Sequence, residues 1–195
     1  MVNKIILASA SKSRADLLRG AGLDIECCPA GLDESLIKGE GLSVRETALK
    51  LSFAKALAVS EKYPGLYIIG ADQMMACEGQ RYDKPVDQEE AKKQLMDLRG
   101  KIHHLISAVS IVKNKKLIWS YAQSAELEMR DFSDMFLDCY LNDIGKDVLT
   151  TVGGYRLESL GVQLFSRIEG DYFTILGLPL LAVLEFLRSR DILTH

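Results

Sequence analysis

The chain has 195 residues, of which 48% are hydrophobic and 26% charged, so it has the composition of a globular protein and can bury a sizeable core. Its formal net charge of −3 provides no basic excess for holding a nucleic-acid backbone, which argues against a duplex-binding role. No stretch approaches the roughly 18 apolar residues of a membrane span, and polar residues interrupt the N-terminal apolar run by Ser9, unlike a signal peptide, so we expect a cytoplasmic protein.

The first predicted element is a short strand from Ile5, followed by a turn rich in serine and cationic residues and by a helix over residues 15–20. A helix N-terminus presents unpaired N–H groups and a partial positive charge, which together attract anions. The turn adds hydroxyl donors and full positive charges from Ser9, Ser11, Ser13, Lys12 and Arg14. The stretch therefore predicts a phosphate-binding turn. The alternative is an ordinary strand–turn–helix in which a serine caps the helix.

A predicted loop at residues 30–41 carries two adjacent carboxylates, Asp33 and Glu34. They could supply an acidic group to a site, and the alternative is a solvated pair of loop side chains. The next helix, predicted over residues 43–61, begins at a serine–glutamate capping box and carries Lys55. A lysine there could bind a phosphate as a point charge, although most lysines are simply exposed.

The strand predicted at residues 66–72 is apolar throughout and is expected to end at Asp72. A carboxylate at a strand end lies at the edge of a sheet, where it could hold a divalent metal or accept a proton from water. The alternative is an aspartate that merely forms a turn. Lys84, which precedes a proline and is therefore held extended, is a second lysine that could bind a phosphate.

Beyond residue 72, strands and helices mix without a strict strand–helix–strand alternation. The expected elements are a hairpin at residues 74–80, a helix at 87–98, an antiparallel ribbon of strands at 103–113 and 116–130, a helix at 133–141, a glycine corner at 153–155, a partly extended segment at 160–167, a turn-rich segment at 168–173 and a helix at 177–190. The order predicts an α/β fold with a mixed sheet, helices around it and two lobes. P-loop and Rossmann glycine motifs are absent.

The four cysteines, Cys27, Cys28, Cys77 and Cys139, form no CxxC motif, which argues against a zinc site or a disulfide framework. We expect them to be small core residues of a protein in a reducing compartment. The first two are adjacent in a strand predicted at residues 25–28, so their side chains should face opposite ways.

Taken together, these motifs resemble the Maf family of nucleotide pyrophosphatases, in blocks that run in order from Leu7 to about Leu187. The matching residues are 7–11, 14, 17–18, 33–34, 54–56, 69–72, 84–85, 98–100, 103, 153–155, 168–173 and 177–180. The resemblance implies a single Maf-like domain over residues 1–195. It also implies a Maf/inosine-triphosphatase-like fold, in which an elongated mixed sheet is flanked by helices and a central cleft separates two lobes.

The resemblance further implies that a nucleoside triphosphate is hydrolysed to the monophosphate and pyrophosphate with a divalent cation, Mg²⁺ or Mn²⁺, which would keep an unwanted nucleotide out of nucleic acids. By the same resemblance Asp72 is the proton acceptor and, with Glu34, a metal ligand. The substrate-binding residues that it implies are Ser9, Ser11, Arg14, Lys55 and Lys84. No nucleic-acid or membrane partner is implied, and a homodimer is left open.

Three positions bear on which nucleotide is accepted. Ser13 stands where many members of the family have arginine, and Gln73 and Glu158 resemble the branch that prefers 7-methyl-GTP. A glutamate suits guanine, because its carboxylate can accept from the N1–H and N2–H₂ donors together. The alternatives are a dTTP/UTP pyrophosphatase of the same family, which residues 169–173 resemble, and a non-catalytic nucleotide-binding regulator of cell division, which Ser13 would favour.

Overall fold

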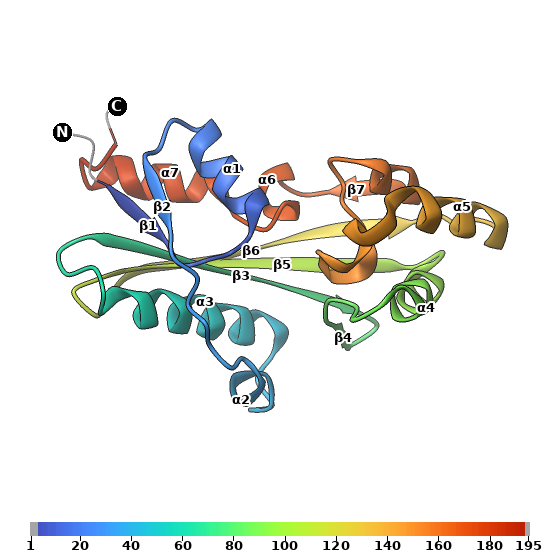
Figure 1. Cartoon of the computed structure of the whole chain (residues 1–195), viewed down its shortest axis with the longest axis horizontal. Coiled ribbons are helices and arrows are strands. Elements are labelled where there is room, and N and C mark those ends of the chain that lie inside the picture. The colour runs from blue at the N-terminus through green and yellow to red at the C-terminus, as the bar shows by residue number, and fades with distance from the viewer. Residues whose placement is uncertain (1–3, 194–195) are drawn as a thin grey trace. The chain divides into compact units, whose positions relative to one another are not determined.

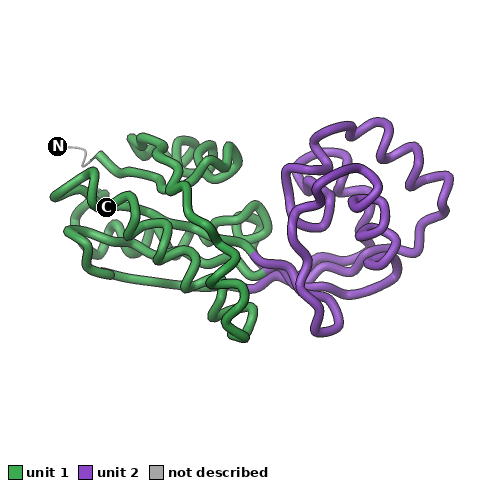
Figure 2. The backbone as a smooth tube through the Cα atoms, turned by 60° about the horizontal axis from the view of Figure 1, so that its bottom comes forward, with its two compact units in different colours: residues 1–73, 106–123, 171–195 green, residues 74–105, 124–170 purple. Residues whose placement is uncertain are grey.

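The computed structural model describes residues 4–193, which form two compact units (Figure 2). Unit 1 runs to Gln73 and adds residues 106–123 and the chain from Asp171 onward. Unit 2 consists of residues 74–105 and 124–170. Each unit is therefore assembled from segments that are distant in the sequence.

Within the described residues, seven strands form one sheet in the order β2-β1-β3-β5-β6-β7, with β4 paired to β3 (Figure 1). The strands are β1 Ile5–Leu7, β2 Ile25–Cys27, β3 Tyr67–Cys77, β4 Gln80–Tyr82, β5 Ile102–Lys113, β6 Lys116–Met129 and β7 Phe165–Glu169. β1 is parallel to β2 and β3, whereas β4 and β7 pair antiparallel with β3 and β6, which confirms a mixed sheet. The predicted ribbon of β5 and β6 is not separate but belongs to this sheet.

The helices cover the sheet and match most of the expected positions. They are α1 Lys12–Gly20, α2 Ser35–Lys38, α3 Val44–Ser60, α4 Gln88–Leu98, α5 Asp134–Ile144, α6 Tyr172–Ile175 and α7 Leu180–Ser189, with the 3-10 helices η1 Gly145–Leu149, η2 Val152–Gly154 and η3 Leu160–Leu164. The capping box before α3 is formed as predicted, because Ser43 and Glu46 each bond the main-chain N–H of the other. Among the described residues, no helix is both long and apolar enough to cross a membrane.

In unit 1 the sheet lies between two layers of helices, with α1 and α7 on one face and α3 on the other (Figure 1). The alternation of side chains along β1 explains this arrangement. Ile5 and Leu7 belong to the cluster that contains Leu18 of α1 and Val183 of α7. Ile6 points the other way and belongs to a second cluster, beneath α3. Both faces of β1 are thus buried, as is usual for parallel strands.

Helix α3 comes very close to β3 at Gly70. A Cβ atom added to Gly70 would lie 2.1 Å from the carbonyl oxygen of Ser52 and 2.7 Å from the amide nitrogen of Ala56, so only glycine fits. Because residues two apart on a strand share a face, the same approach brings the helix against Asp72. Lys55 precedes Ala56 on the helix and is therefore placed beside that carboxylate.

Unit 2 contains an aromatic cluster around a buried histidine. His103 is 0% exposed, and its Nε2 lies 2.7 Å from the Tyr155 hydroxyl. The ring of Phe165 lies 4.8 Å from that of Tyr155, measured between centroids. Tyr140 of α5 donates to the carbonyl of Gly154 at 3.1 Å, which ties the helix to the glycine corner.

Two expectations are wrong in detail. The predicted loop at residues 30–41 contains the short helix α2, and the turn-rich segment at 168–173 contains the end of β7 and the start of α6, whereas the segment at 160–167 is partly extended as expected, with η3 before β7. In both cases a helix of four residues forms, which is too short to produce a periodic pattern in the sequence.

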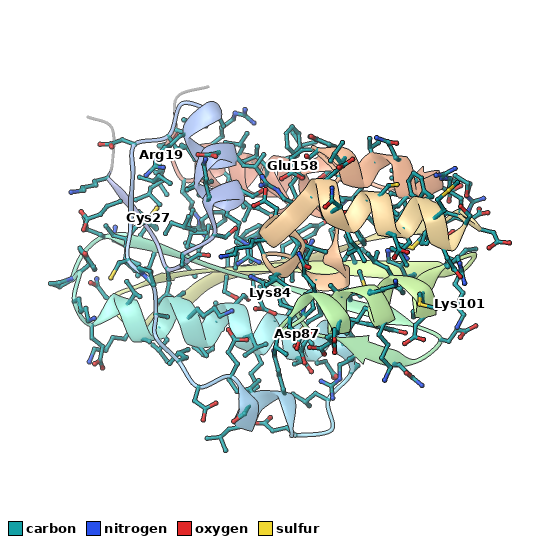
Figure 3. All side chains as sticks on the ribbon, turned by 45° about the vertical axis from the view of Figure 1, so that its right-hand side comes forward. Arg19, Cys27, Lys84, Asp87, Lys101 and Glu158 are labelled. Carbon is teal, nitrogen blue, oxygen red and sulfur yellow. The ribbon has the colours of Figure 1, made fainter. Side chains whose placement is uncertain are left out.

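The cysteines are all free, as predicted, but only Cys77 is a core residue. Cys27 and Cys139 are exposed and Cys28 is half-buried (Figure 3 labels Cys27). Cys27 ends β2, the edge strand of the sheet, whereas Ile25 on the same face of that strand is buried. The expectation of four buried thiols is therefore wrong.

Candidate active site

Asp72 lies within a strand and not at its end, because β3 continues through it to Cys77. The residues that follow, Met74 and Met75, are buried and extend the apolar pattern of the strand. The expected strand end is therefore wrong. The Asp72 residue is only 5% exposed, so a charged carboxylate is held in the interior. A buried carboxylate of this kind needs a compensating charge.

Lys55 provides that charge and joins two carboxylates. Its Nζ lies 2.6 Å from Asp72 Oδ1 and 2.7 Å from Glu34 Oε1. Glu34 comes from the start of α2, and it also pairs with Lys38 at 3.4 Å. Partial burial alone would raise the pKa of Glu34, but the hydrogen bond and charge of Lys55, with Lys38, outweigh burial and lower it. The structure thus brings together three of the predicted site residues.

The second oxygen of the Asp72 carboxylate could take part in a reaction. Asp72 Oδ2 is buried and has no hydrogen-bond partner among the described residues. An unpaired charged oxygen in the interior is costly. The position is therefore suited to a water molecule, a protonated group of a substrate, or a cation.

The serine-rich turn after β1 is formed, and its helix begins earlier than expected, at Lys12. Ser11 is the N-cap, since its Oγ accepts from the main-chain N–H of Arg14 at 3.4 Å. Ser9 Oγ accepts from the N–H of Ser11 at 3.1 Å and from Arg14 Nη1 at 3.3 Å. Ser11 therefore caps α1, as the alternative interpretation expected, and phosphate binding by this turn stays a prediction.

Arg14 is half-buried and is bound mainly to the main chain. Its Nε donates to the carbonyl of Gly177 at 2.8 Å and its Nη1 to the carbonyl of Ala71 at 2.9 Å. Burial lowers the pKa of Arg14, and the negative charges of Asp72 and Glu34 oppose that shift. The guanidinium therefore helps to balance the carboxylates and also holds the main chain immediately before Asp72.

Ser13 and Gln73, predicted to bear on specificity, contact α6 and the residue that follows it. Ser13 Oγ donates to the carbonyl of Leu176 at 3.1 Å. Gln73 Nε2 lies 3.2 Å from the carbonyl of Thr174 and 2.9 Å from that of Ile175. In this structure both side chains are therefore hydrogen-bonded to main-chain carbonyls of the protein itself.

Lys84 and Glu158 belong to unit 2, where Lys84 lies between β4 and α4 (Figure 3 labels both residues). Glu158 Oε1 accepts from two nitrogens of Arg156, at 3.1 Å from Nε and 3.0 Å from Nη2. That hydrogen bond, together with Asp147, raises the pKa of Arg156. A contribution of Lys84 and Glu158 to the site around Asp72 stays a prediction.

Asp72 and Glu34, the two predicted metal ligands, could bind a cation only if a substrate supplied further ligands. Among residues 4–193, no group of three or more histidine, cysteine, aspartate or glutamate side chains is gathered that could hold an ion. Asp72 offers its unpaired Oδ2, and Glu34 stands on the other side of Lys55. Mg²⁺ commonly uses one or two carboxylates and completes its shell with water and phosphate oxygens. The residues present therefore fit an ion that arrives with a phosphate.

Two residues that the sequence did not single out also contact this site. Ser107 Oγ donates to the carbonyl of Thr174 at 2.7 Å, and both residues are 0% exposed. Serine in an apolar strand and threonine in a short helix carry no motif, so nothing in the local sequence pointed to them.

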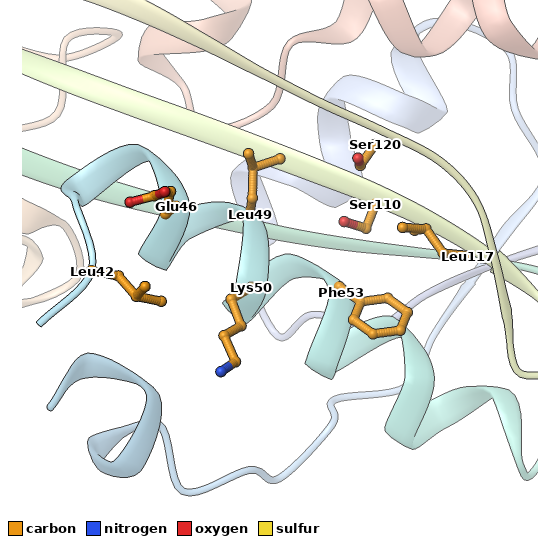
Figure 4. Close-up of a pocket in the computed structure, with 8 residues that line it drawn as sticks. All are labelled: Leu42, Glu46, Leu49, Lys50, Phe53, Ser110, Leu117 and Ser120. Atoms are coloured by element: carbon orange, nitrogen blue, oxygen red, sulfur yellow. The ribbon is translucent and has the colours of Figure 1, made fainter. Parts of the chain in front are cut away.

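A separate groove of about 340 Å³ lies beside α3 in unit 1 (Figure 4). It is lined by Leu42, Glu46, Leu49, Lys50, Phe53, Ser110, Leu117 and Ser120. None of these eight residues is a predicted site residue. The chemistry inferred from the sequence therefore has no connection with this groove.

Comparisons with known proteins find similar sequences over nearly the whole chain. A family described as Maf-like protein matches residues 4–190. A relative from Granulibacter bethesdensis is 47% identical over 195 residues, covering 98% of this chain and 99% of its own, and is named nucleoside triphosphate pyrophosphatase. One from Paramagnetospirillum magneticum bears the same name and is 46% identical over 189 residues, covering 95% of this chain and 97% of its own. A solved HAM1 protein from Coxiella burnetii has a TM-score of 0.45 at 15% identity, covering 67% of this chain and 74% of that chain.

Proposed function

The chain belongs to the Maf-like protein family, and from that premise we propose that its nucleoside triphosphate pyrophosphatase activity depends on Asp72 as the proton acceptor. The protein is a hydrolase of acid anhydrides, like the relatives that share its full length. The observation that carries the proposal is the buried Asp72 Oδ2, which has no hydrogen-bond partner within residues 4–193. The family match spans both units, which supports a single domain over residues 1–195.

In the proposed reaction, Asp72 Oδ2 takes a proton from a water molecule as the water oxygen bonds to the α-phosphorus. The bond from that phosphorus to the oxygen bridging to the β-phosphorus breaks, and pyrophosphate leaves with the electron pair. Lys55 holds Oδ1 at 2.6 Å, which fixes the direction of Oδ2. A divalent cation held by Asp72 and Glu34 would offset the charge on the phosphate oxygens.

The turn after β1 is proposed to bind the triphosphate. Ser9 Oγ is the acceptor in its hydrogen bonds with Ser11 and Arg14, so its own hydrogen can be donated to a phosphate oxygen. Ser11 lies at the α1 N-terminus, where the helix dipole favours anions. Lys84 is proposed to supply a further positive charge. Arg14 contributes charge, while its Nε and Nη1 remain bound to the main chain.

The proposal is tested by measuring pyrophosphate release with Asp72→Asn. The amide keeps the size of the side chain but cannot accept the proton, so turnover should fall by about 10²–10⁴-fold. The matched control is Asp33→Asn, an exposed neighbour of Glu34 whose Oδ1 accepts from the N–H of Ser35 at 2.9 Å, a bond that an amide oxygen can keep. Normal turnover in Asp72→Asn would remove Asp72 from the mechanism.

The finer proposal is that 7-methyl-GTP is the preferred substrate. It is supported by the resemblance at Gln73 and Glu158 and by the state of Glu158, whose Oε1 is occupied by Arg156 while Oε2 is available to a base. Gln73 uses its Nε2 internally, which leaves Oε1, an acceptor suited to the N–H donors of guanine.

A substrate panel separates this proposal from the dTTP/UTP alternative. Pyrophosphate release is measured with 7-methyl-GTP, GTP, dTTP and UTP, for the wild type and for Glu158→Gln. The preference for 7-methyl-GTP should fall about tenfold or more in the variant, because an amide whose oxygen stays bonded to Arg156 presents an N–H₂ donor, in place of Oε2, to the N–H donors of guanine. A ranking led by dTTP or UTP, or one unaffected by the substitution, would count against the assignment.

A further inference from the structure

Four consecutive main-chain carbonyls, those of residues 174–177, accept hydrogen bonds from side chains of three other elements of unit 1. Thr174 O accepts from Ser107 Oγ at 2.7 Å and Gln73 Nε2 at 3.2 Å, Ile175 O from Gln73 Nε2 at 2.9 Å, Leu176 O from Ser13 Oγ at 3.1 Å, and Gly177 O from Arg14 Nε at 2.8 Å. Carbonyls in the last turn of a helix lack partners from further along the helix, so these donors, with the main-chain N–H of Gly177 at 3.0 Å from Thr174 O, fix the end of α6 and the two residues after it. We call residues 174–177 the carbonyl segment.

The amide of Gln73 can adopt only one orientation. Its Nε2 lies within reach of two main-chain carbonyl oxygens and 3.1 Å from Ser107 Oγ. Turned over, the amide would place Oε1 against carbonyl oxygens, which have no hydrogen to donate. Ser107 directs its own hydrogen to Thr174, so its oxygen accepts from Gln73. The hydroxyl therefore joins β3 to the carbonyl segment.

Both sequence neighbours of Asp72 are tied to this segment. On one side, Arg14 donates to the carbonyl of Ala71 at 2.9 Å and to that of Gly177 at 2.8 Å. On the other side, Gln73 is bonded to the beginning of the same segment. The main chain on each side of the carboxylate is thus held by one short stretch of backbone. A misplacement of a reacting group by about 1 Å can cost two orders of magnitude in rate.

We propose that Ser107 is a positioning residue for Asp72, acting through Gln73 and the carbonyl segment. The inference rests on the proposed function of Asp72. Ser107 is 0% exposed and bonds Gln73 and Thr174, so it acts through other residues and not on the substrate itself. The Ser107 hydroxyl donates to Thr174 and accepts from Gln73, and an alanine side chain can do neither.

The test compares Ser107→Ala with Ser110→Ala. Ser110 is a matched control, because it is also 0% exposed on β5 and its Oγ lies 2.7 Å from Ser52 Oγ, away from the carbonyl segment. We measure kcat and KM for pyrophosphate release, the melting temperature, and hydrogen–deuterium exchange of peptides covering residues 171–178. Ser107→Ala should lower kcat about tenfold or more, whereas Ser110→Ala should leave kcat near the wild-type value at a similar loss of melting temperature. Exchange in the peptides should accelerate only in Ser107→Ala.

The outcomes separate the proposals. Equal kcat values for the two variants would overturn the positioning role, even if exchange accelerates. Unchanged exchange in Ser107→Ala would overturn the anchoring of the segment. If the wild type releases no pyrophosphate, the proposed function fails, and with it the positioning of Asp72 for catalysis, while exchange still decides whether Ser107 anchors the segment. Ser107→Cys, which keeps a weak donor and acceptor, should recover part of kcat.

Discussion

Acidification should destabilise the protein through His103, the buried histidine of unit 2. Burial, reinforced by the charge of neighbouring His104, lowers the pKa of His103 from 6.5 to about 4. A charged imidazole donates from both ring nitrogens and needs an acceptor for each, but Nδ1 has no hydrogen-bond partner within residues 4–193 and Nε2 is engaged with Tyr155. The folded state therefore excludes a proton that the unfolded chain binds below about pH 6.5.

The size of this loss of stability follows from how far the pKa of His103 is lowered. A difference of about 2.5 units at 1.36 kcal/mol per unit corresponds to about 3 kcal/mol. Because the folded pKa is the lower one, this stability is present above pH 6.5, declines as the pH falls and is fully lost below about pH 4. Between pH 6 and 4.5 His103 alone should contribute a slope approaching about 1.4 kcal/mol per pH unit to the free energy of unfolding.

The assay is urea unfolding followed by circular dichroism at several pH values, for the wild type, His103→Gln and His104→Gln. His103→Gln should start from a lower stability at pH 7 but show a shallower slope, because the titrating group is gone. His104→Gln is the comparison, since its side chain is 49% exposed; burial, the larger cause of the lowered pKa of His103, remains in this variant, so most of the wild-type slope should remain. Identical slopes for the wild type and His103→Gln would refute the reasoning.

Two further substitutions test the packing that places the site. Gly70→Ala should lower the free energy of unfolding by about 1–3 kcal/mol or more, because the new Cβ meets α3 backbone at 2.1 Å, whereas Gly20→Ala, with nothing within 4 Å, should be nearly neutral in the same urea titration. Lys55→Met should cost about 3–5 kcal/mol, because Asp72 loses its partner in the interior. Lys50→Met, on the same helix with a 46% exposed side chain, should cost less than about 1 kcal/mol, and equal losses for the two lysines would contradict the buried bridge.

The sequence predicts the helices and strands that depend on residues close together in the chain. The capping box at Ser43 and Glu46 marks the start of α3 within a residue, because both bonds form inside one turn. The unbroken apolar run before Asp72 predicts a buried strand, and β3 is one. Its end was misplaced because Gly70 looks like a terminator in sequence, whereas in space it is the contact point for α3.

The connections of the site could not be predicted in this way. Nothing in the spacing of Lys55, Asp72 and Glu34 shows that one ammonium bridges both carboxylates, since the contact depends on how closely α3 packs on β3. Ser107 and Gln73 find their common partner more than sixty residues away, at Thr174. The resemblance to a family supplied the names of several of these residues, but not what each one bonds.

Ser13 and Arg14 reach their partners Leu176 and Gly177 across 163 residues of sequence. During synthesis the N-terminal turn therefore leaves the ribosome long before the carbonyls that hold it have been translated. Contacts of such separation form late and slow the folding of the region that needs them. A nascent chain can fold α3 onto β3 and still lack the anchor for Arg14. Translation through residue 177 thus sets the earliest moment at which the hydrolase can mature.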